Sequence, residues 1–299
     1  MLARAFRGLA QGFYIDVGAM DPVTHSVTCH FYDQGWHGIN IEPARRHFAR
    51  LVELRPRDIN LNFALGEREE VRDFFDVPES GLSSLSDAPP AAADAASLSR
   101  VTVPGMRVTT LARVCAEHVG ARTIDFLKID VEGWERQVIA GGDWRRFRPR
   151  IVVVEATRPN SPQAAWAEWE PTLLGSDYLF AWFDGLNRFY VRREDAALRQ
   201  HFAVPPNVFD DFVPWDVERL TRERDSARAE HARLSEVHLR LADEHQRAAA
   251  ELAREACRRM ARETELEAVY RSHSWRLTAP LRWLAARLGR RGPGGPDGR

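Results

Sequence analysis

A segment of 65 residues, 215–279, contains neither glycine nor proline and is rich in arginine, glutamate and alanine. These residue types favour helix, whereas glycine and proline interrupt it. An unbroken helix of this length would extend roughly 100 Å, and it could not bury its own apolar face. The segment is therefore predicted to be one long helix. It follows a folded domain at residues 1–213, and residues 215–272 form the helical extension of the chain.

Apolar side chains recur along this extension at every seventh residue, which is the spacing of a coiled-coil seam. The positions are Leu220, Ala227, Leu234, Leu241 and Ala248. Four acid–arginine pairs, each four residues apart, are placed to form ion pairs along the helix. The pairs are Glu218/Arg222, Glu236/Arg240, Asp243/Arg247 and Glu255/Arg259. Two interpretations follow: a coiled coil that makes the chain a homo-oligomer through residues 215–272, and a solvated single helix.

The last part of the chain is basic and amphipathic. No acidic residue occurs between Glu267 and Asp297, while arginines alternate with tryptophan and leucine. Basic helices with tryptophan commonly lie in the interface of anionic membranes. We therefore predict peripheral membrane contact through residues 273–291; a helix that docks on a protein partner or on the domain itself is the alternative. Residues 292–299 are predicted to form a disordered tail.

The net charge argues against a nucleic-acid-binding protein, and the cysteines argue against a metal or redox site built from them. A formal net charge of −1 and a pI near 6.8 provide no field that attracts phosphates, so we expect no nucleic-acid partner. The three cysteines lack metal-type or redox-type spacing, which favours a reduced, cytoplasmic protein. No apolar run approaches the ~18 residues of a membrane span, so any membrane contact is expected to be peripheral, at the inner face.

Residues 1–213 alternate between short apolar runs of β-forming residues and helical stretches. The predicted strands are residues 13–17, 38–41, 59–65, 124–129, 151–154, 178–183 and 189–191. Strands that alternate with helices indicate an α/β fold with a mostly parallel sheet covered on both faces. Residues 88–99, which include two prolines and an alanine cluster, are predicted to form a surface loop.

Two strand ends carry residues suited to a small-molecule site. The first strand holds Asp16 near its end and leads to Gly18, where a doubly wound sheet opens its ligand crevice. The spacing G-x-G-x-x-G is absent after Gly18, so a cofactor without a pyrophosphate fits better than a dinucleotide. Glu42 ends the second strand, where one carboxylate can accept hydrogen bonds from both hydroxyls of a ribose. A surface acid is the alternative for Glu42.

Lys128 is the only lysine among the 42 Lys and Arg residues of the chain. A compact ammonium fits narrow buried spaces, so the lysine favours a tight polar site at this position. The alternative is that this one lysine occurs at the end of the strand by chance. The period of two places one set of side chains on the same face of its strand: Ile124, Phe126, Lys128 and Asp130. A buried ammonium needs carboxylate partners, so we predict an ion pair of Lys128 with Asp16, Glu155 or both.

Five segments carry a family resemblance: FYIDVGAMDP (13–22), FYDQGWHGINIEP (31–43), FLKIDVEGWE (126–135), IVVVEATRPN (151–160) and FDGLNRFY (183–190). Over about residues 11–213 the sequence resembles the FkbM-type S-adenosylmethionine-dependent methyltransferases. The resemblance implies a Rossmann-like seven-stranded methyltransferase fold and methyl transfer from S-adenosylmethionine, usually to an oxygen. Where relatives read Gly-Ala-Asn-Asp, this chain has Met20 in place of the asparagine and loses a polar contact at the cofactor loop.

The resemblance also implies roles for individual residues. Asp16 and Gly18 would frame the methionine part of the cofactor, and Glu42 would bind the ribose. The full set of predicted cofactor-binding residues is Asp16, Gly18, Ala19, Glu42, Ala64, Leu65 and Asp130, with the backbone of Ala64 and Leu65 at the adenine edge. The predicted catalytic residues are Asp130, Glu132 and His25, ranked in this order as the general base, together with Lys128.

Other residues are candidates for the acceptor side of the site. Ser83 and Ser84, in the segment 81–85, are predicted to bind the acceptor, with an ordinary turn as the alternative. Glu155 is a candidate for a supporting or metal-binding residue, and dependence on a divalent metal such as Mg²⁺ stays open. Trp134 and Trp182 can stack on a sugar face, although burial is the commoner fate of tryptophan near a sheet.

The leading hypothesis is an O-methyltransferase that methylates a sugar hydroxyl of a bacterial surface polysaccharide or glycolipid. It rests on residues 272–280 (SHSWRLTAP), which are similar to segments at the ends of glycosyltransferases from polysaccharide clusters. The layout of domain, coiled coil and membrane helix is also similar to O-antigen chain-terminating methyltransferases. Two alternatives remain. A scaffold for glycan assembly is supported by Met20 alone, and a methyltransferase of a small secondary metabolite does not explain the helical tail.

Overall fold

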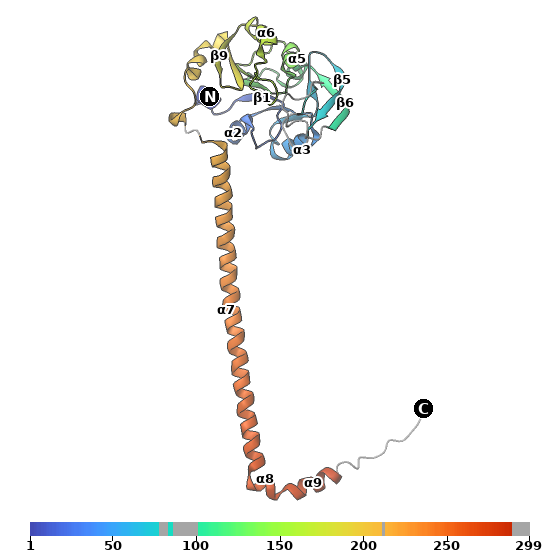
Figure 1. Cartoon of the computed structure of the whole chain (residues 1–299), viewed down its shortest axis with the longest axis vertical. Helices are drawn as coiled ribbons and strands as arrows, with labels where there is room; N and C mark the ends of the chain where they lie inside the picture. The colour runs from blue at the N-terminus through green and yellow to red at the C-terminus, as the bar shows by residue number, and fades with distance from the viewer. Residues whose placement is uncertain (78–82, 86–100, 211–212, 289–299) are drawn as a thin grey trace, which may run out of the picture. The chain divides into compact units, whose positions relative to one another are not determined.

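The computed structural model describes residues 1–77, 83–85, 101–210 and 213–288 (Figure 1). The chain divides into two compact units, Met1–Val213 and Pro214–Arg299. Three predictions fall at least partly outside the described residues. They are the loop at 88–99, the first two residues of the segment 81–85 and the tail at 292–299.

The first unit is built on a seven-stranded sheet with the order β3-β2-β1-β7-β8-β10-β9. Its strands are β1 (Phe13–Val17), β2 (His37–Ile41), β3 (Ile59–Leu61), β7 (Phe126–Ile129), β8 (Ile151–Glu155), β9 (Tyr178–Phe183) and β10 (Asn187–Arg192). Neighbouring strands are parallel from β3 to β8, whereas β10 runs antiparallel to both β8 and β9. The prediction of an α/β fold with a seven-stranded, mostly parallel sheet is confirmed.

Helices cover both faces of this sheet, which is why its central strands are mostly apolar, with Asp16, Lys128 and Glu155 at or near their carboxyl ends. The helices are α1 (Leu2–Ala5), α2 (Val27–Asp33), α3 (Arg45–Leu54), α4 (Leu111–His118), α5 (Glu135–Ala140) and α6 (Glu170–Leu174), with short 3₁₀ turns η2 (Trp166–Glu168), η3 (Arg193–Phe202) and η4 (Val208–Asp210). Residues of α4, α5 and α6 pack in one core cluster, and residues of α1, α2 and η3 pack in another.

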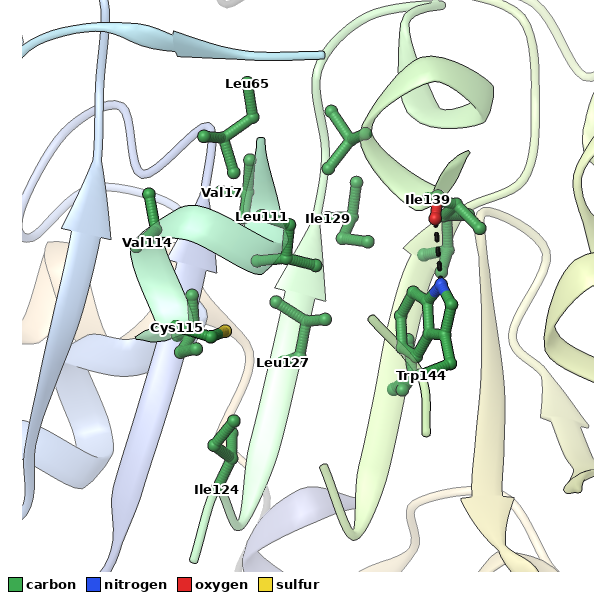
Figure 2. Packing of buried hydrophobic residues seen from close by; sticks show 14 of the residues in the cluster. Val17, Leu65, Leu111, Val114, Cys115, Ile124, Leu127, Ile129, Ile139 and Trp144 are labelled. Carbon is green, nitrogen blue, oxygen red and sulfur yellow. Dashed lines mark hydrogen bonds between the residues drawn. The ribbon is translucent and has the colours of Figure 1, made fainter. Parts of the chain in front are cut away.

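Figure 2 shows the core between α4 and the sheet, where Leu111 of α4 lies over Leu127 and Ile129 of β7. Ile124 packs in this same cluster. The prediction that Ile124 shares a face with Phe126 is therefore wrong, because Phe126 belongs to the opposite cluster. The reason is that β7 begins only at Phe126, so the alternation of a strand does not extend back to Ile124.

A second, three-stranded sheet has the order β4-β6-β5 and consists of β4 (Ala64–Leu65), β5 (Glu70–Asp76) and β6 (Val101–Thr109). The strand predicted at residues 59–65 is thus divided, because its two ends join different sheets. The sequence did not predict β5 or β6. Most of β5 is only partly buried and its sequence is largely charged, while β6 contains Pro104 and Gly105, which are typical of turns.

A buried polar network joins the ends of β1 and β2 to the residue before β3. The Tyr14 hydroxyl donates to Asp58 Oδ2 at 2.6 Å, the Gly38 N–H donates to Asp58 Oδ1 at 2.7 Å, and the Asn40 amide donates to Asp58 Oδ2 at 2.9 Å. Arg55 lies 3.9 Å from the same carboxylate. Asp58 is therefore a buried acid whose acceptor positions are filled from neighbouring strands.

The second unit begins with α7 (Trp215–Arg271), which is followed by α8 (His273–Leu277) and α9 (Ala279–Leu288). The prediction of one continuous helix over residues 215–279 is wrong, because Ser272 is extended, with φ −63° and ψ 144°. The Ser272 Oγ accepts a hydrogen bond from the Trp275 N–H, which caps α8 and begins a new helix. No described helix is long and apolar enough to cross a membrane.

The side chains of α7 behave as those of a solvated helix. All four predicted ion pairs form: Arg222–Glu218, Arg240–Glu236, Arg247–Asp243 and Arg259–Glu255. The heptad leucines Leu220, Leu234 and Leu241 are 55%, 58% and 58% exposed. No described part of the chain covers this stripe, so the coiled coil stays a prediction.

The Asp58 network leads to a first prediction. Tyr14→Phe removes a donor from a buried carboxylate, and we expect it to lower the free energy of unfolding by about 1.5–3 kcal/mol. Tyr178→Phe is the matched control, because the Tyr178 hydroxyl donates to a neutral carbonyl, that of Pro149, at 2.8 Å. The control should lose only about 0.5–1.5 kcal/mol. Equal losses in urea unfolding would contradict a special contribution from the charged acceptor.

Candidate functional site

A cleft that is partly open to solvent lies at the carboxyl ends of β1, β2 and β7. The chain leaves β1 for β2 on one side and later returns to β7 on the other side. Ligands of open α/β sheets bind at such a switch point.

The turn after β1 brings two loops into backbone contact. Gly18 has a φ of +77°, and a Cβ at this position would lie 1.8 Å from the carbonyl oxygen of Asp130. The N–H groups of Gly18 and Ala19 donate to the carbonyl of Ile41 at 3.0 and 3.2 Å. Glycine is therefore required at position 18, and bare backbone forms this wall of the cleft.

Glu42 is held in the cleft by two backbone hydrogen bonds. Its side chain follows β2, and the residue is only 5% exposed. Its Oε2 accepts from the Met20 N–H at 2.8 Å, and its Oε1 accepts from the Ala44 N–H at 2.7 Å. Burial raises the pKa of Glu42 to about 7, although these two bonds favour the ionised form. Each oxygen retains a second acceptor position, which a ligand hydroxyl can fill.

Lys128 lies at the floor of the cleft between two carboxylates. Its Nζ is 3.2 Å from Asp16 Oδ1 and 3.4 Å from Asp130 Oδ2, and it donates to the Gly18 carbonyl at 3.1 Å. The second oxygen of Asp16 accepts from the Thr28 hydroxyl at 2.9 Å. Burial opposes the charge of Lys128, but Asp16 and Asp130 outweigh this effect and raise its pKa. The predicted ion pair between Lys128 and Asp16 is confirmed.

Three acids form a cluster beside this lysine: Asp130, Glu132 and Glu155 each offer one oxygen within 4.8 Å of the others. Burial, and then the neighbouring carboxylates, raise the pKa of Glu132 to about 8 and that of Glu155 to about 10. Of the two partners predicted for Lys128, Glu155 forms no ion pair with it among the described residues and lies beside Asp130 instead. The site is therefore richer in carboxylates than in cations.

Three non-glycine residues of the cleft have positive φ angles: Met20 at 50°, His25 at 58° and Glu132 at 53°. Asparagine tolerates this conformation better than most residues, whereas a long side chain such as methionine rarely adopts it. Met20 therefore occupies a position at which the backbone itself favours the asparagine of the relatives. Strain of this kind gathers at functional sites.

Ser83 and Ser84 line the cleft, but both hydroxyls are engaged. The Ser83 Oγ donates to Asp76 Oδ1 at 2.7 Å, and the Ser84 Oγ donates to the Glu132 carbonyl at 2.9 Å. Ser84 thus also secures the segment to the loop after β7, and Ser83 secures it to β5. Contact of the serines with an acceptor stays a prediction. Trp134 lines the cleft, with the Arg72 guanidinium 4.7 Å from its ring centroid.

The structure brings most of the predicted site residues together. Those that line the cleft are Gly18, Ala19, His25, Glu42, Ala64, Leu65, Ser83, Ser84, Lys128, Asp130 and Glu132. Asp16 and Glu155 are buried behind the wall; Asp16 pairs with Lys128, and Glu155 lies beside Asp130. The interpretation of Trp182 as a sugar platform is wrong, because Trp182 packs against the core cluster that contains Phe126.

His47 and Phe74 are among the side chains that line the cleft and that sequence reasoning missed. Phe74 belongs to β5, which the sequence did not predict as a strand. His47 lies in the first turn of α3, and only its nearness to Glu42 in the sequence would have suggested it. Both residues reach the cleft because of tertiary packing rather than a local pattern.

The sheet order, the antiparallel strand β10 and the cleft at the switch point define a Rossmann-like α/β protein with a small-molecule site. Comparison with protein families identifies the family within this class. The family model described as the methyltransferase FkbM domain matches residues 16–180, more than half of the chain, so the chain belongs to the FkbM methyltransferase family. Comparisons with curated proteins and with solved structures gave no match.

The buried ion pair leads to a second prediction. Lys128→Met leaves the Asp16 carboxylate buried without its ammonium, and we expect it to lower the free energy of unfolding by about 3–5 kcal/mol. The double variant Lys128→Met/Asp16→Asn removes both charges and should recover much of this loss. Denaturant unfolding of the two single variants and the double variant measures the coupling. A loss in the double variant equal to the sum of the losses of Lys128→Met and Asp16→Asn would show that the charges are not coupled.

Proposed function

We propose that the chain is an S-adenosylmethionine-dependent O-methyltransferase. The observation that carries the proposal is the Glu42 carboxylate, which is fixed at the end of β2 and keeps acceptor positions beside the cleft. A carboxylate at this position suits the two hydroxyls of a ribose. Membership of the FkbM methyltransferase family supports methyl transfer as the reaction.

The residues of the cleft fit the parts of this cofactor. The bare backbone at Gly18 and Ala19 suits the methionine part, with Lys128 and Asp130 beside it. Glu42 suits the ribose. The apolar side chains that suit the adenine are Ala64, Leu65, Phe74 and Leu85. Asp16 is proposed as a positioning residue, because it acts through Lys128 and Thr28 rather than at the cleft surface.

When bound, S-adenosylmethionine supplies a methyl group whose bond to sulfur breaks as a bond to the acceptor oxygen forms. The chain must orient the acceptor hydroxyl and take its proton. Asp130, Glu132 and His25 all line the cleft and are the proposed proton acceptors. Comparison of Asp130→Asn, Glu132→Gln and His25→Asn tests them: loss of the base should lower kcat by about 10²–10⁴-fold and spare cofactor affinity.

For the acceptor, we propose a sugar hydroxyl of a surface polysaccharide or glycolipid. Support comes from Trp134, whose ring borders the cleft, and from the basic helical end of the chain. A small secondary metabolite is the alternative acceptor. The scaffold alternative has one specific observation in its favour, the unfavourable φ of Met20 at the cleft.

Cofactor binding and its pH dependence provide a third prediction. Ionised Glu42 accepts two hydroxyl hydrogen bonds, and its pKa is about 7. Affinity for S-adenosylhomocysteine should therefore rise about tenfold between about pH 6 and about pH 8. Lys128 and Asp16 are the charged groups that act on Glu42 most strongly.

Calorimetric titration of the full chain with S-adenosylhomocysteine tests this. Glu42→Gln should bind more weakly at about pH 8 and lose the dependence on pH. Glu53→Gln, an exposed acid of α3, is the matched control and should behave as the native chain. Absence of binding at both pH values would defeat the proposed function and favour the scaffold.

The φ of Met20 gives a fourth prediction. Met20→Asn should raise the free energy of unfolding by about 0.5–1 kcal/mol, because asparagine adopts the left-handed region more readily. It should also tighten S-adenosylhomocysteine binding, since the Met20 N–H holds Glu42 in place. Thermal unfolding and calorimetry measure the two effects. A variant that binds no better than the native chain would show that Met20 does not weaken the site.

We also propose that the end of the chain binds the inner face of an anionic membrane. In α8 and α9 apolar side chains are exposed beside arginines: Leu277, Leu281, Trp283 and Leu284. The Arg282 guanidinium lies 3.6 Å from the Trp275 ring centroid, and the Arg287 guanidinium lies 4.0 Å from that of Trp283. Tryptophan and arginine combined in this way suit the headgroup region.

Co-sedimentation with vesicles is the fifth prediction. The full chain should sediment with vesicles rich in anionic lipid and remain in solution with neutral vesicles, because the attraction is largely electrostatic. Removal of residues 271–299 should abolish sedimentation. A double variant, Arg282→Gln/Arg287→Gln, should weaken it and keep the apolar side chains. Sedimentation unchanged by the truncation would exclude these residues as the membrane contact.

A further inference from the structure

The acidic cluster arises from the register of two neighbouring strands. β7 and β8 are parallel, with Ile129 opposite Val154. The next residue of each strand is an acid, Asp130 after β7 and Glu155 at the end of β8, so the two carboxylates meet at the same edge of the sheet. Glu132, in the loop after β7, adds a third, and one oxygen of each lies within 4.8 Å of the others.

The described residues do not neutralise this cluster. Lys128 is the nearby cation, and its Nζ is shared between Asp130 at 3.4 Å and Asp16 at 3.2 Å. No ion pair between Glu132 or Glu155 and a basic side chain occurs in the described part of the chain. Carboxylates that approach one another at a partly buried site favour either a cation or a shared proton.

A second observation points to a ligand. Glu155 is 7% exposed, and its Oε2 is fully buried without a hydrogen-bond partner among the described residues. The Oε2 of Glu132 is also buried without a hydrogen-bond partner among the described residues. Other buried acids of this chain are satisfied: Asp125, for example, accepts from the Phe13 N–H at 3.0 Å and pairs with Arg150 at 3.0 Å. Unpartnered buried oxygens are uncommon in proteins and indicate a missing partner.

We propose that Asp130, Glu132 and Glu155 bind one divalent cation of the Mg²⁺ or Mn²⁺ class. The ligand set contains only carboxylate oxygens, which such hard cations prefer, and lacks the cysteine or histidine ligands typical of zinc. Asp130 and Glu132 line the cleft, whereas Glu155 is buried behind them. The cation therefore lies at the cleft wall, where water and an acceptor oxygen complete its coordination.

The consequence for catalysis rests on the proposed function. A hydroxyl bound to a divalent cation loses its proton more readily and is held in a fixed position. In this arrangement Asp130 and Glu132 hold the cation rather than take the proton. His25, which also lines the cleft, is then the proposed proton acceptor. The acceptor class that fits best presents an oxygen pair that can chelate, such as the neighbouring hydroxyls of a sugar.

Cation binding is tested without cofactor or acceptor. The full chain, treated with EDTA and dialysed, is titrated with Mn²⁺ to about 10 mM, above the dissociation constants of roughly 10⁻⁴–10⁻³ M of weak oxygen-ligand sites, and bound Mn²⁺ is measured by electron paramagnetic resonance. We expect one site, competition by Mg²⁺, and a Tm that Mg²⁺ raises. Glu155→Gln should weaken binding by more than about tenfold. Glu53→Gln should bind as the native chain does.

The outcomes separate the cation from a shared proton. If Asp130 and Glu155 share a proton instead, no Mn²⁺ binds and Mg²⁺ leaves the Tm unchanged, which overturns the proposal. Binding that Glu155→Gln does not weaken also overturns it, because the ion then lies elsewhere. The Tm of Glu155→Gln in EDTA shows that the variant folds, and Glu132→Gln provides a second test. S-adenosylhomocysteine titration of the same samples reports separately on the cofactor site.

Discussion

The buried pair of Lys128 and Asp16 is the interaction on which the candidate site depends. These residues lie opposite each other on the adjacent strands β1 and β7, where the sheet changes from apolar core to polar cleft. The ammonium also reaches Asp130 and the Gly18 carbonyl, so one side chain connects the turn after β1 with the loop after β7. Loss of the ammonium would leave the buried Asp16 carboxylate without a cation.

Much of the fold follows from local sequence pattern, and the exceptions have physical causes. β1 and β8 were predictable because a strand buried on both faces is mostly apolar. β5 was not predictable, since its exposed positions are charged and its contacts are with a small separate sheet. The end of α7 depends on Ser272, a residue that helices tolerate and whose capping bond appears only in three dimensions.

Some residues of the candidate site could also be predicted from the sequence, and others could not. Asp16, Glu42 and Asp130 could be predicted because carboxyl ends of parallel strands meet at one edge of the sheet. His47 and Phe74 come from elements that approach the cleft through packing, which leaves no periodic signal. The sequence marks Met20 as a lost polar group, whereas the structure shows a second effect, an unfavourable backbone angle.

The contact between Gly18 and the Asp130 carbonyl limits how this protein can move. A Cβ would not fit between the two loops, and Lys128 bonds to both of them, so the two loops form one rigid wall. Adaptation to different acceptors is therefore expected from other residues of the lining, such as Ser83. Evolution of new acceptor specificity in this chain is expected to change those residues and to preserve the wall.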